Sequence, residues 1–376
     1  MRRFPGIPEP RLCGRSPRAA RKHLLHLLAS FAIALAASQA ATAQGETWRS
    51  LTRKAEILHQ HGHYDDAVLA VKKALEIAER DLGPDHPDVA TSLNFLALLH
   101  EAKGEYPAAE KSYQRALAVM QKALGPEHHS VAIAVGNLAE LYKTQGRYAE
   151  AESLCERALE IAEGALGPHH PNVATSLNNL AGVHYVQSHF AAAEPLYERA
   201  LAIRERALGP HNSAVAASLN NLAAVHRARG QYAAAEPLYE RSLAIALRSL
   251  GPQHPAVAVA LNNLAELHGA RGQYAEAERL HQQSLAILEA VLGPEHPDLD
   301  QSLNYLAELY GAREQYVAAE HYYRRSLAIR ELYLGPDHPA VARSLQSISR
   351  LYTLMGRLED ARKLADRAAK IRGRLR

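Results

Sequence analysis

The sequence predicts an all-α fold, a solenoid of about eight helical hairpins, and three observations support this prediction. Apolar residues recur at helical spacing within each segment, and a glycine or another turn residue interrupts each segment near its middle. The tripeptide Leu-Gly-Pro recurs every 42 residues, ending at Pro84, Pro126, Pro168, Pro210, Pro252, Pro294 and Pro336. Such an unbroken stride predicts one elongated array of stacked hairpins and not a set of separate globular domains.

The second unit shows how one segment becomes two helices. Leu93, Leu96 and Leu99 share one face of a first helix. Gly104 ends that helix, and Tyr106 begins a second helix with its own apolar stripe. The Leu-Gly-Pro tripeptide then ends the second helix, because glycine adopts a left-handed cap readily and proline cannot continue a helix.

Small residues recur at fixed positions of both helices, and an aromatic residue follows the turn in every unit except the last. Small side chains allow paired helices to approach closely, while the aromatic ring fills the space beside them. We therefore expect eight hairpins and sixteen helices. The units are expected near residues 47–84, 88–126, 130–168, 172–210, 214–252, 256–294, 298–336 and 340–373.

Residues 1–43 differ from the rest of the chain. A basic segment precedes an apolar run over residues 24–37 and the small-x-small sequence Ala41-Thr42-Ala43, an order typical of a secretory signal peptide. The apolar run is shorter than the roughly 20 residues that a transmembrane helix needs. The sequence therefore predicts export to a bacterial-type periplasm or extracellular space, with a mature chain beginning near Gln44. An uncleaved leader that anchors the chain to the membrane is the alternative.

Composition and motifs argue against several classes of function. Removing residues 1–43, with their seven basic residues and one acid, changes the formal net charge from +3 to −3 and leaves no basic face for a nucleic acid. The sequence has no HExxH motif, no phosphate-binding glycine loop and no nucleophile elbow, so we predict neither an enzyme nor a cofactor. Most of the 21 histidines lie one repeat apart in columns, too far from each other to share a metal ion, and we predict no metal site.

The repeated pattern L-N-N-L-A, followed by G-x-Y-x-x-A-E and L-G-P, resembles the kinesin-light-chain class of tetratricopeptide repeat. Residues 219–223 with Gly230 and Tyr232 are one instance, and residues 261–265 are another. The resemblance spans about residues 47–373. It implies a right-handed superhelix whose concave wall is formed by the first helix of each pair and binds extended peptides, in part through asparagines. A motor-cargo role is not implied, because the long heptad segment that binds the motor is missing.

Two columns of asparagines in the first helices are the candidate peptide-binding residues. The first column contains Asn94, Asn178, Asn220, Asn262 and Asn304, and the second contains Asn137, Asn179, Asn221 and Asn263. An amide both donates and accepts hydrogen bonds, so a ladder of amides can pair with an extended backbone whatever its side chains. Adjacent residues differ by about 100° around a helix, so only one column is expected to face a ligand and the other is expected to be structural.

The sequence therefore predicts a non-catalytic scaffold that binds a protein or peptide segment in a concave groove. The remaining predicted groove residues are mixed in charge, which argues against selection of one strongly charged motif; they are Glu101, Glu140, Lys143, Arg227, Glu266, Glu308 and Arg350. The alternative is a structural or assembly spacer of the cell envelope that contacts partners by its ends or convex face. A membrane contact is expected only if the leader is uncleaved.

Overall fold

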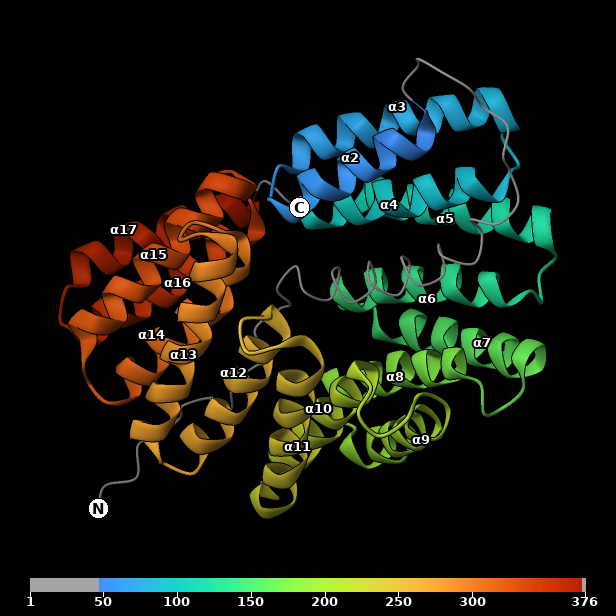
Figure 1. The fold of residues 1–376 in the computed structure, drawn as a ribbon. Coiled ribbons are helices and arrows are strands. Elements are labelled where there is room, and N and C mark those ends of the chain that lie inside the picture. The colour runs from blue at the N-terminus through green and yellow to red at the C-terminus, as the bar shows by residue number, and fades with distance from the viewer. Residues whose placement is uncertain (1–46, 374–376) are drawn as a thin grey trace.

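The computed structural model describes residues 47–373, which form sixteen α-helices and one short 3-10 helix, with no strand among them. The helices pair into eight hairpins, as predicted (Figure 1). The first helices are α2 (Trp48–Gln60), α4 (Pro87–Ala102), α6 (His129–Thr144), α8 (Pro171–Val186), α10 (Ser213–Ala228), α12 (Pro255–Ala270), α14 (Asp300–Ala312) and α16 (Pro339–Leu354). The second helices are α3 (Tyr64–Leu82), α5 (Tyr106–Leu124), α7 (Tyr148–Leu166), α9 (Phe190–Leu208), α11 (Tyr232–Leu250), α13 (Tyr274–Leu292), α15 (Tyr316–Leu334) and α17 (Leu358–Gly373). The predicted signal peptide lies outside the described residues.

The junction histidines are helix caps. In six of the hairpins the histidine Nδ1 accepts a hydrogen bond from the backbone N–H two residues later, for example from Ala340 to His338 at 3.1 Å. Asn212 replaces histidine once, and its Oδ1 accepts the equivalent bond from Ala214 at 2.9 Å. Both side chains satisfy an N–H group that the first turn of the helix leaves free. Since Nδ1 is the acceptor, a neutral junction histidine carries its proton on Nε2.

The turn inside each hairpin requires a left-handed residue. Six of these turns contain glycine at φ between 73° and 80°. Ser188 and Glu314 adopt the same conformation at φ 63° and 59°, so the turn survives without glycine at a modest cost in strain. The geometry of the turn is therefore set by the helices on each side.

The core follows the predicted columns of small residues. The alanines of the first helices, from Ala55 to Ala307, are completely buried at 42-residue intervals, and so are those of the second helices from Ala67 to Ala319. Ser349, which ends the first column, donates a hydrogen bond to the carbonyl of Ala361 at 2.7 Å. These columns therefore lie in the core where the two helices of each hairpin contact each other.

The array curves toward its first helices. First helices of successive hairpins contact each other, including α4 with α6, α6 with α8, α10 with α12, and α12 with α14. Second helices pack mainly on the first helices before and after them. Figure 1 shows the resulting curve, in which the hairpins wind from α2 and α3 around to α16 and α17.

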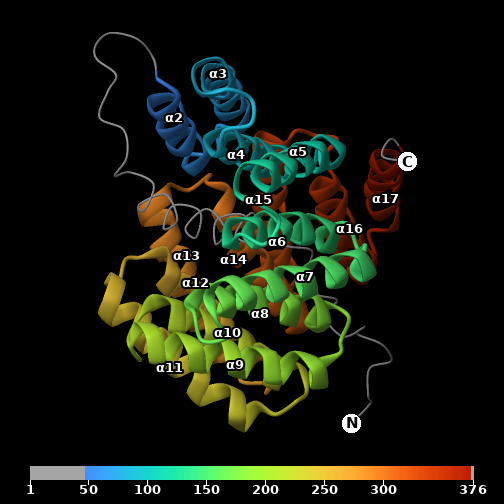
Figure 2. The ribbon, with the colours of Figure 1, turned by 90° about the vertical axis from the view of Figure 1, so that its right-hand side faces the viewer.

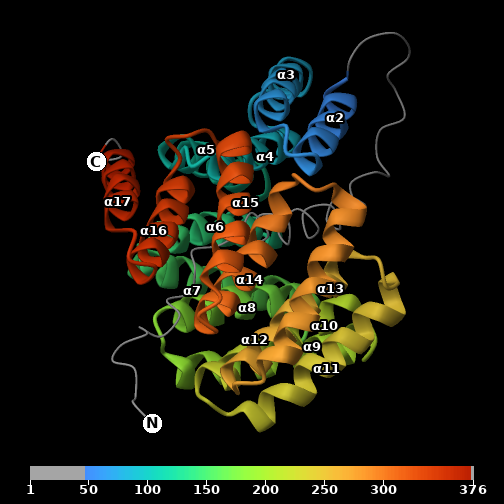
Figure 3. The same ribbon diagram turned by 90° about the vertical axis from the view of Figure 1, so that its left-hand side faces the viewer.

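The two ends of the array meet. Tyr333 and Leu334, at the end of α15, pack against the hydrophobic cluster of the first two hairpins. His296 Nε2 donates a hydrogen bond to the carbonyl of Gln60 at 2.7 Å, although 236 residues separate them. Figures 2 and 3 show α4 and α5 beside α15 from opposite sides. The expectation of an elongated array was therefore wrong, because the small rotation between successive hairpins accumulates to a complete turn.

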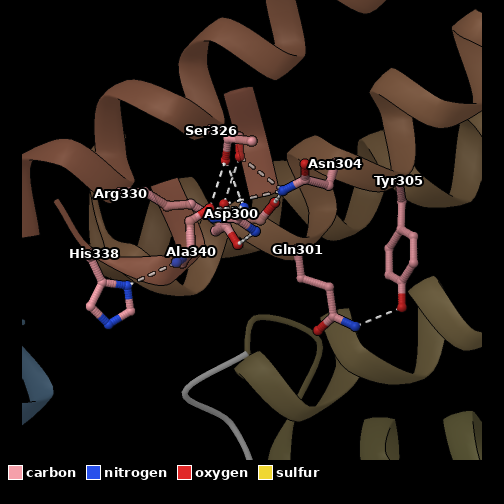
Figure 4. A network of polar contacts seen from close by, with 9 residues as sticks. Asp300, Gln301, Asn304, Tyr305, Ser326, Arg330, His338 and Ala340 are labelled. Carbon is pink, nitrogen blue, oxygen red and sulfur yellow. Dashed lines mark hydrogen bonds and ion pairs between the residues drawn. The ribbon is translucent and has the colours of Figure 1, made fainter. Parts of the chain in front are cut away.

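Hairpin 7 departs from the repeat at its start. Its first helix begins with the 3-10 helix η1 (Pro297–Leu299), and Asp300 follows where hairpins 2 to 6 and hairpin 8 have alanine. The buried Asp300 carboxylate accepts hydrogen bonds from Arg330 Nη2 at 2.6 Å, Ser326 Oγ at 2.6 Å and Asn304 Nδ2 at 3.1 Å (Figure 4). Such a charge is stable in the core only because its partners surround it.

Candidate functional site: the inner wall

The candidate site is the concave side of the first helices, which we call the inner wall. It comprises the second column of asparagines and the charged residues of the same helices: Asn137, Asn179, Asn221, Asn263, Glu101, Glu140, Lys143, Arg227, Glu266 and Glu308. First helices of successive hairpins contact one another, and Asn221 on α10 reaches Asn178 on α8 while Arg227 on α10 reaches Glu266 on α12. Arg350, which we also expected here, is exposed on α16.

The first column of asparagines bonds mostly within the protein. Asn178 Nδ2 donates to the carbonyl of Ala174 at 2.6 Å, one helical turn before it. Asn262 is almost completely buried and contacts His281 Nδ1 at 2.9 Å. Asn304 donates to Asp300 and Ser326. These contacts give the column a structural role in hairpins 4, 6 and 7.

Two other members of this column are less completely bonded. Asn94 is buried and Asn220 is partly buried, and in the described part of the chain the Oδ1 atom of each has no hydrogen-bond partner. An unsatisfied buried acceptor is unfavourable. Gly136 interrupts the column, and a Cβ atom there would come within 3.2 Å of Asn179 Nδ2.

The second column of asparagines contains three partly exposed amides, as the first column does at Asn178, Asn220 and Asn304. Asn179, Asn221 and Asn263 are partly exposed at a constant stride on α8, α10 and α12, whereas Asn137 is buried. Asn221 Nδ2 donates to Asn178 Oδ1 at 3.1 Å, which joins the two columns between adjacent hairpins. Three amides of this column are thus accessible, and their use by a ligand remains a prediction.

Charges on the inner wall are paired in two places. Glu140 and Lys143 form a buried ion pair at 2.6 Å on α6. Arg227 on α10 reaches Glu266 on α12 at 3.2 Å, and this carboxylate raises the pKa of the arginine. Both pairs lie where water is scarce, so they rigidify the wall and leave little net charge for a ligand to use.

Glu308 is an acidic residue of the wall with an unusual pKa. Its side chain is exposed on α14, but the protein around it desolvates the carboxyl group, and Glu266 lies one hairpin away. Desolvation first and Glu266 second raise the pKa of Glu308 to about 7. The wall therefore gains negative charge around neutral pH at the hairpin 6–7 end.

Sequence reasoning missed the aromatic contact beside this carboxyl group. His281 stands where four of the eight second helices carry tyrosine, and it stacks on Tyr305 with ring centroids 5.2 Å apart. Tyr305 stands where the second asparagine column would continue, and its hydroxyl accepts a hydrogen bond from Gln301 at 2.6 Å. The sequence did contain a signal for this contact, because His281 and Tyr305 both depart from the residues of their columns.

Other kinds of site have no support in residues 47–373. No group of three histidine, cysteine, aspartate or glutamate side chains there is arranged to hold a metal ion. His59, the centre of the local histidine group, packs edge-on against Tyr64 and Phe95. Two shallow surface hollows lie at the hairpin 7 turn around Tyr310 and Tyr322 and along α7, both away from the inner wall. Of the helices in this range, none combines the length and apolar character needed to cross a membrane.

Solved structures share this architecture. A Rap protein crystallised with Competence and Sporulation Factor is 14% identical, with 87% of this chain and 98% of that chain covered and a TM-score of 0.55. The apo form of RapI is 13% identical over 76% of this chain and 98% of its own, with a TM-score of 0.52. BtubC (BKLC) from P. vanneervenii is 26% identical over 62% of this chain and 92% of its own, with a TM-score of 0.49. The two Rap structures support the fold alone.

Sequence comparison covers nearly all of the described chain. No curated protein matches it. The tetratricopeptide repeat model matches residues 46–122, 88–154, 130–206, 214–290, 261–332 and 298–373. The chain therefore belongs to the tetratricopeptide repeat family, with a 42-residue unit that resembles the kinesin-light-chain class.

Proposed function

We propose that this tetratricopeptide repeat scaffold binds an extended peptide or protein segment along its inner wall. The observation that supports this most is the stride of Asn179, Asn221 and Asn263, three partly exposed amides on successive first helices. An extended backbone presents N–H and C=O groups at regular intervals, and each amide can pair with one of each. Recognition of this kind depends little on the side chains of the bound segment.

The paired charges support the same proposal. Because Glu140 is neutralised by Lys143, and Arg227 by Glu266, most of the wall can accept a segment without separating charge from solvent. Glu308 adds one acidic position, which favours a segment with a basic residue at that end. No catalytic step is proposed for any of these residues.

A selection experiment tests the proposal. Unstructured peptides are selected from a display library on the described chain, and binding is then measured to a variant with Asn179, Asn221 and Asn263 all changed to Ala. We expect affinity to fall about tenfold or more, since each lost backbone bond contributes about 0.5–1.5 kcal/mol. Circular dichroism should remain helical.

The matched control changes three exposed residues at the same stride on second helices, Glu198, Glu240 and Gln282, to Ala. This control should keep its affinity. Equal affinity of the inner-wall variant and wild type would remove the inner wall as the binding site, and a loss in the control alone would favour the convex face.

The cellular location is a separate proposal that depends on residues 1–43. We propose that the chain works outside the cytoplasm, on the order of basic, apolar and small residues in that segment. N-terminal sequencing of the protein from its source should find a start near Gln44. Recovery of the intact leader in a membrane fraction would instead support a tethered scaffold.

A further inference from the structure

The two ends of the array meet at two equivalent contacts, which lie one hairpin apart. His296 Nε2 donates to the carbonyl of Gln60, and a Cβ atom added to Gly62 would lie 2.6 Å from the ring of Tyr333. One hairpin later, a Cβ atom added to Gly104 would lie 2.5 Å from His338 Nε2. In both places the turn of an early hairpin covers the junction histidine of a late one, with the same offset in sequence.

The turns that take part in this contact need glycine for a second reason. All six glycine turns have positive φ, but within residues 47–373 only Gly62 and Gly104 have another part of the chain against them. A Cβ atom on Gly146, Gly230 or Gly272 would meet nothing within 4 Å. The close approach is therefore confined to the two ends of the array.

The late hairpins also carry a residue suited to this contact. Tyr333 packs against the hydrophobic cluster of hairpins 1 and 2. At its position the six preceding hairpins have no aromatic residue; they have Asp81, Ala123, Ala165, Ala207, Ser249 and Val291. Hairpin 7 is thus specialised where the first turn lies on it, and the repeat itself does not require a tyrosine there.

We propose that these contacts form a clasp that closes one turn of the superhelix, and that opening of the clasp controls lateral access to the inner wall. The clasp consists of the turns at Gly62 and Gly104 together with His296, Tyr333 and His338. In the closed form, a segment reaches the wall only by passing a free end through the turn. In the open form, a segment flanked by folded domains enters from the side. This inference rests on the proposed binding function.

The size of the clasp suits a reversible device. It joins parts of one chain, so a few contacts suffice to hold it closed. It involves one hydrogen bond, one aromatic ring and two close turns, which is far less than the interface within a hairpin. A small change in the angle between successive hairpins, added over the array, is enough to separate the ends.

The first experiment measures the shape of the chain without any ligand. Small-angle X-ray scattering compares wild type with a double variant, Tyr333→Ala with Gly104→Ala, and with a control, Val291→Ala with Gly230→Ala. Gly104 and Gly230 have φ values of 74° and 73°, so both variants carry the same backbone strain. Val291 holds the position of Tyr333 in hairpin 6 and is half exposed.

We expect a larger radius of gyration and maximum dimension for the clasp variant only, with equal helicity in all three proteins. Equal dimensions of the clasp variant and the control, or a wild type that is already extended, would overturn the clasp. Alanine is the residue of hairpins 2 to 4 at the Tyr333 position, so that single change keeps the hairpin foldable and serves alone if the double variant is unstable.

The second experiment measures access. Asn221→Cys places a thiol on the inner wall, and its reaction is followed with a small maleimide and with a maleimide attached to a small folded protein. Cys155 is buried, and the background is measured on wild type. In the clasp variant, the reaction rate of the large reagent should rise about tenfold, because the open form changes from a minor to a major population. The reaction rate of the small reagent should stay the same.

These outcomes separate the clasp from the proposed binding function. An opened array with unchanged access of the large reagent overturns the gating role and leaves peptide binding intact. Equal peptide affinity of the inner-wall variant and wild type, with the scattering result as expected, overturns the binding function. The clasp then remains as a closure of the fold, and its access role fails with the binding function.

Discussion

Hairpins 4 and 7 bury an arginine at the same position of their second helices, but only hairpin 7 provides a carboxylate for it. Arg204 Nη1 donates to Ser218 Oγ at 2.8 Å, and Arg330 Nη1 donates to Ser344 Oγ at 2.6 Å. Arg330 also forms an ion pair with Asp300 at 2.6 Å. The position of Asp300 in hairpin 4 holds an alanine, so Arg204 is satisfied by hydroxyl and carbonyl oxygens alone.

The difference shows how one substitution changes the electrostatics of an otherwise regular array. Burial lowers the pKa of Arg204 to about 10, still well above neutral, so this arginine remains charged in the core. The hairpin fixes where each guanidinium lies and which backbone carbonyl it reaches. A single side chain on the facing helix then decides whether the charge is compensated.

The largest effect is expected from Asp300→Ala, which gives hairpin 7 the residue that hairpins 2 to 6 and hairpin 8 have there. Loss of the carboxylate leaves Arg330 in the position of Arg204, with the bonds to Ser344 and Ala340 only. Removal of one partner from a buried pair costs about 3 kcal/mol. Hydrogen exchange of the amides of α14 and α15 should report this loss. Protection equal to wild type would mean that the carboxylate adds nothing to the other bonds of Arg330.

Replacing each of the two arginines by leucine should destabilise hairpin 7 more than hairpin 4. Arg330→Leu leaves Asp300 buried with Ser326 and Asn304 and is expected to cost about 2 kcal/mol. Arg204→Leu removes a buried charge that has no counter-ion and is expected to change stability by less than about 1 kcal/mol. Thermal unfolding of both variants is the measurement. Equal losses would show that packing of the arginine stems matters more than charge.

Transplanting the network into hairpin 4 is a third way to test the comparison. Asn178 already occupies the position of Asn304, so Ala174→Asp with Ala200→Ser supplies the two missing groups. A fully bonded pair should stabilise the array by about 1 kcal/mol, seen as a higher melting temperature. Ala174→Asp alone lacks the hydroxyl and should give a smaller gain. A fall in stability for the double variant would indicate that the space beside Ala174 cannot accept a carboxylate.

The sequence predicted the local structure of both hairpins well. The columns of small residues marked the close-packed face of each helix, and Leu-Gly-Pro marked the end of each second helix. Both features depend on neighbours within about one unit, so the sequence of a single unit indicates them. The capping role of the junction histidines was not predicted. The signal was present in Asn212, a common capping residue that replaces histidine in that column.

The sequence did not predict that the ends of the array meet, nor which asparagines of the inner wall are buried. Closure depends on the sum of small rotations, which no single repeat reveals, and the sequence gives no sign that Gly62 would lie on Tyr333. Burial of Asn94 and exposure of Asn179 likewise depend on the packing of neighbouring hairpins. Departures from a column, such as Asp300 among alanines, were the marks that could have indicated hairpin 7.

The smallest expected effect extends the comparison to the inner wall, where the carboxyl group of Glu308 lacks the cation that Lys143 provides for Glu140. The raised pKa of about 7 means that the folded chain holds a proton on Glu308 that the unfolded chain loses near pH 4.5. Stability of wild type should therefore fall relative to Glu308→Gln as the pH rises from about 4.5 to 7.

The difference should stay below about 1 kcal/mol, because the Glu308 side chain is open to solvent. Urea unfolding at pH 5 and pH 8 measures it. Glu140→Gln is the matched control and should have the opposite sign at pH 8, since it leaves the buried ammonium group of Lys143 without its carboxylate. A pH-independent difference for Glu308→Gln would mean that water screens this carboxyl group fully, and hairpin 7 would then differ from the others only in its buried network.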